Sequence, residues 1–395
     1  MWLDDHRPLS LGAAPAGAGL SCDAFRDFGI SAVRIGGTSV AVRQSVRARL
    51  PFGVLRSFSR AARPRRRALV VAPLAGSFPF LMRDLVVALL GEIEEVAVTD
   101  WPNARHVPLA AGRFGFAENC MEVAQMVRAM AAGEAAGEAA GEADGEAGEA
   151  AGGGVHVLGV CQGVVPALVA ALMLAEEGLA PASLTLMGGP VDPSRNPTRL
   201  WRVLQERALG ALEAQVIETV GPGFPGTGRR VFPSWRQMDT FGLYLWRQSL
   251  SGGEMPLKLL FDEGDDPVRF PLSRLCWTMM DVTGEYFMEN VATVFRDNAI
   301  AHGTLEIAGR KVRPQALART ALLTIEGEDD DISALCQTAA AHDLCPGVPA
   351  QLRRRLTLAK AGHFSLFYGH AMRREVIPAV VGLMDLAEAD ARGAG

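Results

Sequence analysis

The sequence predicts an α/β protein whose mostly parallel central sheet carries an inserted, mainly helical cap. Short apolar runs typical of buried strands alternate with segments of helical spacing between residues 68 and 187, and the alternation returns after residue 320. Between these stretches, residues 193–313 lose the rhythm and hold half of the aromatic residues. A chain of 395 residues is long enough for one large core domain with such an insertion.

Each predicted element depends on a local pattern of apolar residues. The strands are short apolar runs bounded by turn residues: Ala68–Pro73, Val96–Trp101, Val155–Val160, Ser183–Met187, Thr320–Ile325 and Arg355–Ala359. Helical spacing of apolar residues predicts helices at Arg83–Leu90 and Ala117–Met130. Further helices are predicted at Val164–Glu177, which is apolar on all sides, and near Arg373–Leu386. The chain therefore divides into an N-terminal segment (1–64), a first core part (65–192), the cap (193–313) and a second core part (314–395).

Residues 131–154 contain only Ala, Gly, Glu and Asp. Glycine and glutamate each recur there every four residues, which would stack like charges and helix-weakening glycines in any helix. We predict a flexible insertion in a surface loop. Six of the 44 acidic residues lie in it, so the rest of the chain is close to neutral against 39 basic residues. This balance argues against a nucleic-acid partner.

Composition also bears on compartment and membrane. Six cysteines without a C-x-x-C pair favour a reducing compartment. The acidic start Met1–Asp5 lacks the features of a secretory signal, so we expect a cytoplasmic protein. Val155–Ala175 is long and apolar enough to suggest a membrane span, but Gly163 and Pro166 interrupt it. A buried strand, a sharp turn and a buried helix explain it better.

The five residues Gly159–Gly163, with the sequence Gly-Val-Cys-Gln-Gly, lie at a predicted strand-to-helix junction. The pattern G-x-S-x-G at this place is the nucleophile elbow of α/β-hydrolases, and here Cys161 stands where serine is usual. The glycines leave room for a strained turn, and the helix N-terminus favours a thiolate. The competing interpretation is a buried structural cysteine between two incidental glycines.

An elbow predicts an acid and then a histidine, each after a late strand. His363 follows the strand Arg355–Ala359, where it would accept the thiol proton. Adjacent acids, Asp329 to Asp331, follow the strand Thr320–Ile325, and the pattern alone leaves open which of them orients the histidine. Asp265 and Asp266 form a rival cluster in the aromatic insertion.

An oxyanion hole in this fold uses backbone N–H groups. We predict donors at Gln162 and in the loop after the first core strand, at Leu74 and Ala75. His342 with Cys336 and Cys345 would be the candidate metal ligands, but their spacing is loose. We predict neither a metal nor an organic cofactor.

The sequence also resembles a known family, the intracellular polyhydroxybutyrate (polyhydroxyalkanoate) depolymerases, over about residues 65–380. The motifs that carry the resemblance are Val70–Gly76, Val98–Trp101, Val160–Gln162, Leu186–Asp192, Pro225–Val231, Arg319–Glu328, Asp330–Ser333, Cys345–Pro349 and Gly362–His363. The resemblance implies a Cys-Asp-His triad in which the first Asp of Asp-Asp-Ile-Ser, Asp330, is the acid. This chain departs from the family at Gly163, where proline is expected, in the insertion, and in a short N-terminal region.

The resemblance implies a depolymerase that cleaves esters of amorphous poly(3-hydroxybutyrate) through an acyl-enzyme on Cys161. Its partners would be the polymer or granule surface, with water or a thiol such as coenzyme A as acyl acceptor. Cap aromatics such as Trp235, Tyr244 and Trp246 suit an apolar polyester, although most cap aromatics are expected to form its own core. A polyhydroxyalkanoate synthase-like acyltransferase and a non-catalytic granule-coat protein are the alternatives.

Overall fold

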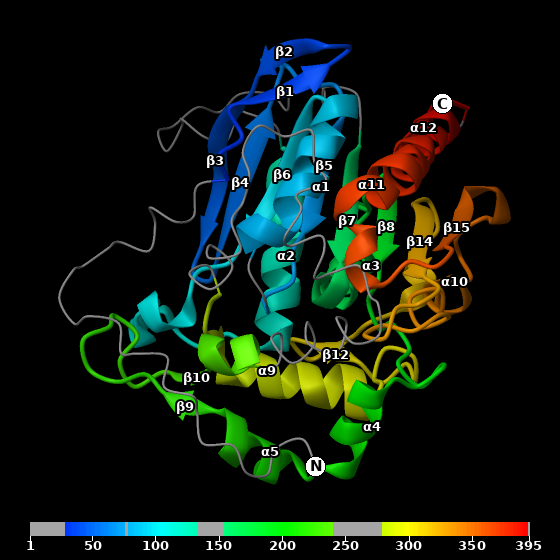
Figure 1. Ribbon diagram of the computed structural model, residues 1–395. Helices are drawn as coiled ribbons and strands as arrows, with labels where there is room; N and C mark the ends of the chain where they lie inside the picture. The colour runs from blue at the N-terminus through cyan, green and yellow to red at the C-terminus, as the bar shows by residue number, and fades with distance from the viewer. Residues whose placement is uncertain (1–27, 76–77, 133–153, 240–278, 394–395) are drawn as a thin grey trace.

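The computed structural model describes residues 28–75, 78–132, 154–239 and 279–393. An eight-stranded sheet forms its centre (Figure 1). In spatial order the strands are β15 (Arg353–Leu358), β14 (Ala321–Gly327), β8 (Ser183–Met187), β7 (Val155–Val160), β5 (Arg67–Val71), β6 (Glu95–Asp100), β4 (Gly53–Ser59) and β3 (Arg43–Leu50). Of these eight, β4 alone is reversed, and the other seven strands run in one direction.

This strand order, with one reversed strand near an edge, is the arrangement of the α/β-hydrolase fold and confirms the predicted fold class. The central strands β5, β7 and β8 are buried along their whole length. Both faces of a parallel sheet are covered, so these strands have no exposed positions, and polar residues such as His156 and Thr185 are buried with the apolar ones. The predicted strands Val155–Val160 and Ser183–Met187 coincide with β7 and β8.

Helices cover both faces of the sheet (Figure 1). One face carries α1 (Phe78–Glu92) and α12 (Ile377–Gly393), and the other carries α2 (Phe116–Ala131) and α3 (Val164–Glu176). The first ten residues of α3 are all apolar, and all but Met173 among its apolar side chains up to Leu174 are buried, as expected for a helix enclosed by core. In the described ranges, none of the helices combines the length and apolar character that crossing a bilayer requires.

The N-terminal part of the chain differs from the prediction. Strands β3 and β4 lie before residue 64 yet extend the central sheet by pairing onto β6. Ion pairs from Arg47 to Glu95 and from Arg56 to Asp100, of 2.7 and 2.6 Å, join these strands across the sheet. The predicted boundary at residue 64 therefore divides the sheet. An edge strand in contact with water carries charged residues, and this hides it from a search for apolar runs.

The described part of the cap contains helices and a small antiparallel sheet. Its elements are α4 (Arg199–Glu206), α5 (Leu209–Val216), β9 (Glu218–Thr219), β10 (Arg230–Phe232), β11 (Val282–Thr283), α9 (Gly284–Asn290) and the π-helical turn Val291–Arg296. Shorter elements elsewhere are β1 (Ala32–Ile35), β2 (Thr38–Ala41), β12 (Glu306–Ile307), β13 (Arg310–Lys311), α10 (Ala341–Leu344) and α11 (Gly369–Ala371). The Ala/Gly/Glu insertion between residues 133 and 153 lies outside the described residues.

Charged side chains attach the cap to the loop that follows β6. Arg105 forms a two-point ion pair with Asp281, with a shortest distance of 2.7 Å. Arg229 donates to the backbone carbonyls of Val107, Pro108 and Gly112 over 2.6–3.1 Å. Because that loop leaves the carboxyl end of β6, these bonds hold the cap over the edge where the parallel strands end (Figure 1).

Glu122 makes the stability of the fold depend on pH. This carboxyl lies inside α2 and accepts the N–H of Phe52 at 3.1 Å, and burial raises its pKa to about 7. Because the pKa of Glu122 is higher in the folded than in the unfolded state, this group stabilises the folded protein below the pKa that it has in the unfolded chain. The contribution is lost as pH rises through about 7. We therefore expect the free energy of unfolding to fall by up to about 3 kcal/mol between pH 5 and 8.

Glu122→Gln tests this expectation, because a neutral amide of similar shape removes the titration. Chemical denaturation across that pH range should give a flatter profile for this variant than for the wild type. Glu92→Gln, at an exposed acid of α1, is the control and should keep the wild-type slope. Parallel profiles for Glu122→Gln and the wild type would contradict the assignment.

Candidate active site

Cys161 lies where β7 turns into α3. It opens the short helical turn Cys161–Gly163, directly before the first residue of α3. Its backbone φ is 52°, a left-handed value that residues with a side chain rarely adopt. Such strain is typical of a nucleophile elbow, where it lifts the side chain above the sheet. The half-buried thiol therefore stands at the carboxyl edge of the sheet, at the positive end of α3.

The glycines beside Cys161 are required by close backbone approach. A Cβ at Gly163 would overlap the carbonyl oxygen of Val71 in β5, and one at Gly159 would lie 2.8 Å from the Cβ of Ala167. The elbow therefore packs on its neighbours through bare backbone. This contact accounts for glycine at position 163, where the family resemblance led us to expect proline.

Gly163→Ala should be harmful for this reason. The added methyl group must displace the elbow from β5, which we expect to lower the free energy of unfolding by about 1–3 kcal/mol and to reduce activity at least tenfold. Thermal melts and steady-state rates measure the two effects. Gly382→Ala is the matched control, since this helical glycine has open space around its Cα and its replacement should be neutral or stabilising. Wild-type behaviour of Gly163→Ala would show that the elbow is not tightly packed.

His363 and Asp330 form a buried pair at the same edge. A hydrogen bond of 2.8 Å joins Nδ1 of His363 to Oδ2 of Asp330. The other carboxylate oxygen, Oδ1, accepts the N–H groups of Ile332 and Ser333, both at 2.8 Å. Asp330 is buried, whereas Asp329 and Asp331 are exposed. Among the three adjacent acids, the one on the histidine is the one that the family resemblance indicated.

The surroundings of His363 favour its protonated form. Burial alone would lower the pKa of the imidazole, but the Asp330 carboxylate and the Cys161 sulfur together raise the pKa well above its ordinary value. Nε2 is buried and makes no hydrogen bond of regular geometry with the described residues. The rings of Phe364 and Phe367 make T-shaped contacts with the imidazole, with centroids 5.4 and 5.6 Å from its own. This environment can hold a proton between the sulfur and the ring.

The predicted oxyanion-hole residues lie together, with one unexpected contact. The N–H of Ala75, in the loop after β5, donates to Oε1 of the Gln162 side chain at 3.0 Å. The Gln162 side chain thus binds the loop that was expected to supply the second oxyanion-hole donor. The backbone N–H groups of Gln162 and Leu74 remain our predicted donors, and in this conformation the N–H of Ala75 is already engaged.

Tyr286, on α9, is a residue near the site that we did not single out from the sequence. It is fully buried, and its hydroxyl has no hydrogen-bond partner among the described residues. Burial, followed by the nearby charges of Cys120 and Cys161, raises the pKa of its phenol. Its ring stacks near that of Phe114, with centroids 6.0 Å apart. No sequence signal separates this tyrosine from the other aromatic residues of the cap.

The remaining candidates lie elsewhere. Trp235 is 44% exposed at the cap surface, with the Arg236 guanidinium 4.3 Å above its ring. Tyr244, Trp246, Asp265 and Asp266 lie outside the described residues.

Of the candidate metal ligands, His342 bonds to a neighbouring side chain. Nε2 of His342 bonds to the Thr324 hydroxyl at 3.0 Å, and burial lowers the pKa of its imidazole to about 4. Cys345 is buried and Cys336 is exposed. Within the described ranges, no group of three or more His, Cys, Asp or Glu side chains is arranged to hold a metal ion.

The sheet order and the elbow define an α/β-hydrolase. A sequence profile described as "PHB de-polymerase C-terminus" matches residues 188–388, more than half of the chain. The chain therefore belongs to the polyhydroxybutyrate depolymerase family and is an ester hydrolase. The matched region contains Asp330 and His363, and Cys161 precedes it.

The solved structures that match this chain have little sequence identity with it. A soluble variant of monoglyceride lipase from Saccharomyces cerevisiae is 11% identical, with 90% of this chain and 97% of that chain covered and a TM-score of 0.48. A hydrolase from Pseudomonas aeruginosa PA01 is 16% identical, with 87% and 98% covered and a TM-score of 0.45. A comparison with curated proteins gave no match.

Proposed function

We propose that this protein cleaves the backbone esters of amorphous poly(3-hydroxybutyrate) through an acyl-enzyme on Cys161. The observation that carries the proposal is the strained elbow cysteine beside a buried His363–Asp330 pair. A nucleophile, a base and a group that orients the base are the parts that acyl transfer requires. Membership of the depolymerase family supports the polyester as substrate.

In the first half-reaction, the Cys161 proton passes to Nε2 of His363 and the sulfur attacks the ester carbonyl carbon. The ester C–O bond breaks, and His363 returns the proton to the departing oxygen, which becomes the hydroxyl end of a shorter chain. The other fragment remains bound as a thioester. Asp330 holds the imidazole in one orientation and stabilises its positive charge. Backbone N–H groups near Gln162 would stabilise the oxyanion.

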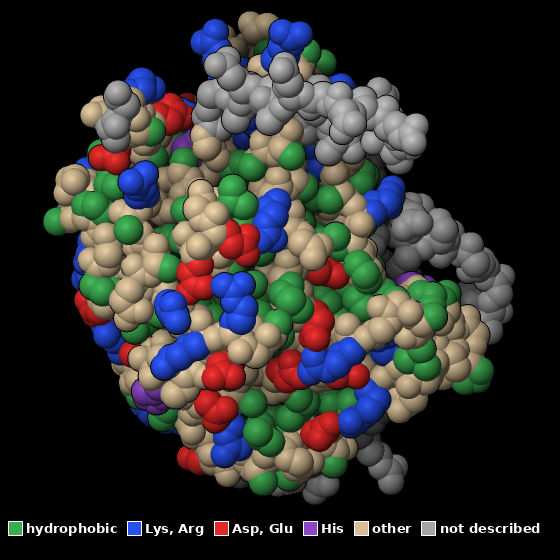
Figure 2. Space-filling view, turned by 180° about the vertical axis from the view of Figure 1, so that it is seen from behind, with side chains coloured by type: hydrophobic (Ala, Val, Ile, Leu, Met, Phe, Trp, Pro, Cys, Tyr) green, Lys and Arg blue, Asp and Glu red, His purple; other side chains and the backbone are tan. Residues whose placement is uncertain are grey.

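In the second half-reaction, His363 removes a proton from water, and the resulting hydroxide attacks the thioester. The C–S bond breaks, a carboxylic acid leaves and the proton returns to Cys161. A thiol acceptor such as coenzyme A would replace water and leave as a thioester. We place this chemistry at the surface of polyester granules in the cytoplasm. Figure 2 shows acidic and basic side chains interspersed over one face, which fits a neutral polymer better than a charged one.

The deciding experiment incubates the protein with protein-free amorphous poly(3-hydroxybutyrate) granules in water enriched in oxygen-18. Hydrolysis should release 3-hydroxybutyrate monomers and oligomers with one heavy oxygen per newly formed carboxyl group. If coenzyme A is added and is the acceptor, 3-hydroxybutyryl-coenzyme A should appear instead.

Two outcomes would refute the proposal. Polymer formed from 3-hydroxybutyryl-coenzyme A, without release of products from granules, would indicate a synthase-like acyltransferase. Granule binding with an unreactive Cys161 would indicate a non-catalytic coat protein.

A further inference from the structure

Two consecutive glycines after β8 form a turn that lies between the Cys161 backbone and the His363 ring. Gly188 has a φ of 58°, and a Cβ on it would lie 3.3 Å from Cε1 of His363. A Cβ on Gly189 would lie 2.5 Å from the backbone carbonyl oxygen of Cys161. The backbone of this turn therefore contacts the imidazole on one side and the peptide group of the nucleophile on the other. A shift of the turn would change the distance between the two groups.

Thr338 holds this turn in place through its side chain. Its hydroxyl accepts the N–H of Gly189 at 3.0 Å and donates to the carbonyl oxygen of the same residue at 2.8 Å. The threonine is fully buried. One hydroxyl thus bonds to both backbone polar groups of the buried Gly189, and leaving these groups without a partner would cost free energy.

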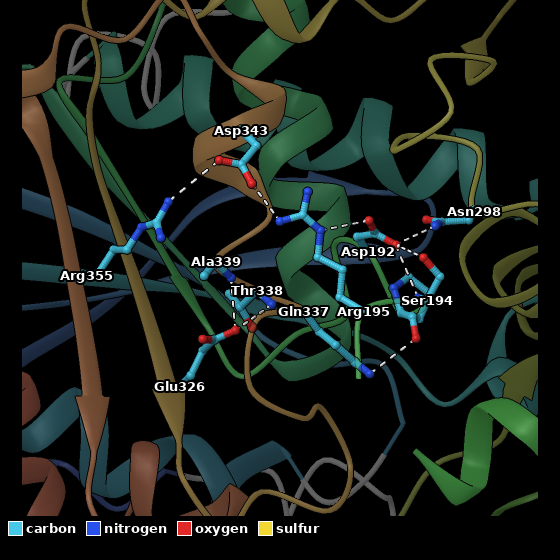
Figure 3. Close-up of polar contacts among 11 residues, drawn as sticks. Asp192, Ser194, Arg195, Asn298, Glu326, Gln337, Thr338, Ala339, Asp343 and Arg355 are labelled. Atoms are coloured by element: carbon cyan, nitrogen blue, oxygen red, sulfur yellow. Dashed lines mark hydrogen bonds and ion pairs between the residues drawn. The ribbon is translucent and has the colours of Figure 1, made fainter. Parts of the chain in front are cut away.

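Glu326 in turn holds Thr338. This buried carboxylate lies next to the end of β14, and its Oε1 accepts the N–H groups of Thr338 at 2.8 Å and Ala339 at 3.0 Å. Its Oε2 accepts the N–H of Cys336 at 3.1 Å. Figure 3 shows Glu326 pointing toward the backbone of Thr338 and Ala339. Since the loop with Asp330 begins just after this strand, one strand end supports both the acid and the glycine turn.

We propose that Glu326 and Thr338 are positioning residues that set the distance and orientation of Cys161 relative to His363. Neither contacts the reacting atoms, and both act through Gly188 and Gly189. Acyl transfer is sensitive to such placement, because a displacement of about 1 Å can lower a rate about a hundredfold. The inference deepens the proposed function and depends on its assignment of Cys161 and His363.

Other contacts keep the same loop attached when the threonine hydroxyl is removed. The carbonyl oxygen of Gln337 accepts the N–H of Asp192 at 3.0 Å, and its side chain donates to the carbonyls of Pro193 and Asn196. Asp192 also accepts the Asn298 amide of the cap at 2.6 Å (Figure 3). Loss of the hydroxyl should therefore alter the turn without detaching the loop.

The test compares Thr338→Val with Thr338→Ser. Valine keeps the volume and removes the hydroxyl, whereas serine keeps the hydroxyl. On p-nitrophenyl butyrate, we expect Thr338→Val to lower kcat 10- to 100-fold with KM changed less than twofold. Thr338→Ser should keep at least half of the wild-type kcat. Glu326→Gln should give a smaller loss, since its amide oxygen can still accept from Thr338 and Ala339 but its NH2 group cannot accept from Cys336.

A second readout is independent of any ester. The rate at which iodoacetamide alkylates Cys161, followed by peptide mass spectrometry across pH, reports on the Cys161–His363 pair. We expect its inflection to move in Thr338→Val and to return in Thr338→Ser. A simple structural role would lower the melting temperature and leave this profile unchanged in the folded protein.

The outcomes separate this inference from the proposed function. Wild-type kcat and a wild-type alkylation profile in folded Thr338→Val would overturn the positioning role. If Thr338→Val does not fold, the profile of Glu326→Gln decides in the same way. A wild-type protein that releases nothing from granules, while these variants shift the alkylation profile, would refute only the polyester substrate.

Discussion

Cys161→Ala is expected to abolish the release of soluble products from poly(3-hydroxybutyrate) granules. The substitution removes the only sulfur that we place at the elbow, and without a nucleophile no acyl-enzyme can form. The fold should persist, because the thiol is half-buried and alanine adds no atoms to the turn. Product analysis by mass measures the loss, and thermal melts and granule co-sedimentation test whether fold and binding remain.

Cys161→Ser provides a graded comparison. Its hydroxyl needs stronger help from the base than a thiol does, so we expect a large but incomplete loss. Substantial turnover by Cys161→Ala would contradict the assignment of the nucleophile. In that case Cys161 would be a structural residue of the elbow.

Asp330→Asn is expected to lower kcat by about four orders of magnitude. The carboxylate bonds to Nδ1 of His363 at 2.8 Å, and an amide can present its NH2 group there and so hold the ring in the wrong tautomer. Asp330 also accepts two backbone N–H groups of its own loop, a contact that the amide oxygen can keep. The loss should therefore reflect catalysis more than folding. Rates measured on the same granules give the comparison.

Asp329→Asn is the matched control, since Asp329 is the exposed neighbour of Asp330. It should retain most of the wild-type activity and the wild-type melting temperature. If Asp329→Asn is the crippled variant and Asp330→Asn is active, the loop after β14 has a different conformation during catalysis, and our acid is misassigned by one residue.

Much of the fold was predictable because it is encoded in local patterns. Strands β7 and β8 appear as short, largely apolar segments of the correct length because both of their faces are buried. The elbow was recognisable from five residues because close backbone contacts require glycine at positions 159 and 163. Strands β3 and β4 were missed. The edge strand β3 is largely exposed to water and is rich in arginine, and β4, although mostly buried, carries arginine and serine among its apolar residues.

Residue type alone did not predict which of three adjacent aspartates bonds to His363. Asp329, Asp330 and Asp331 are chemically identical, and Asp330 was indicated by the resemblance to a family and by its place three residues after Gly327. In the structure, Asp330 turns inward because its carboxylate accepts the N–H groups of Ile332 and Ser333 within a tight loop. That selection depends on the path of the backbone rather than on residue type.

The sequence by itself therefore determined the alternating core, the place of the cap, and the cysteine and histidine at the ends of their strands. Tertiary structure alone decided which side chains support them. Thr338 and Gly189 lie 149 residues apart, and the hydroxyl that joins them leaves no periodic signal in the chain. Tyr286 likewise approaches Cys161 only because the cap folds over the carboxyl edge of the sheet. Periodicity reports on neighbours along the chain, whereas these contacts arise from the packing of distant segments.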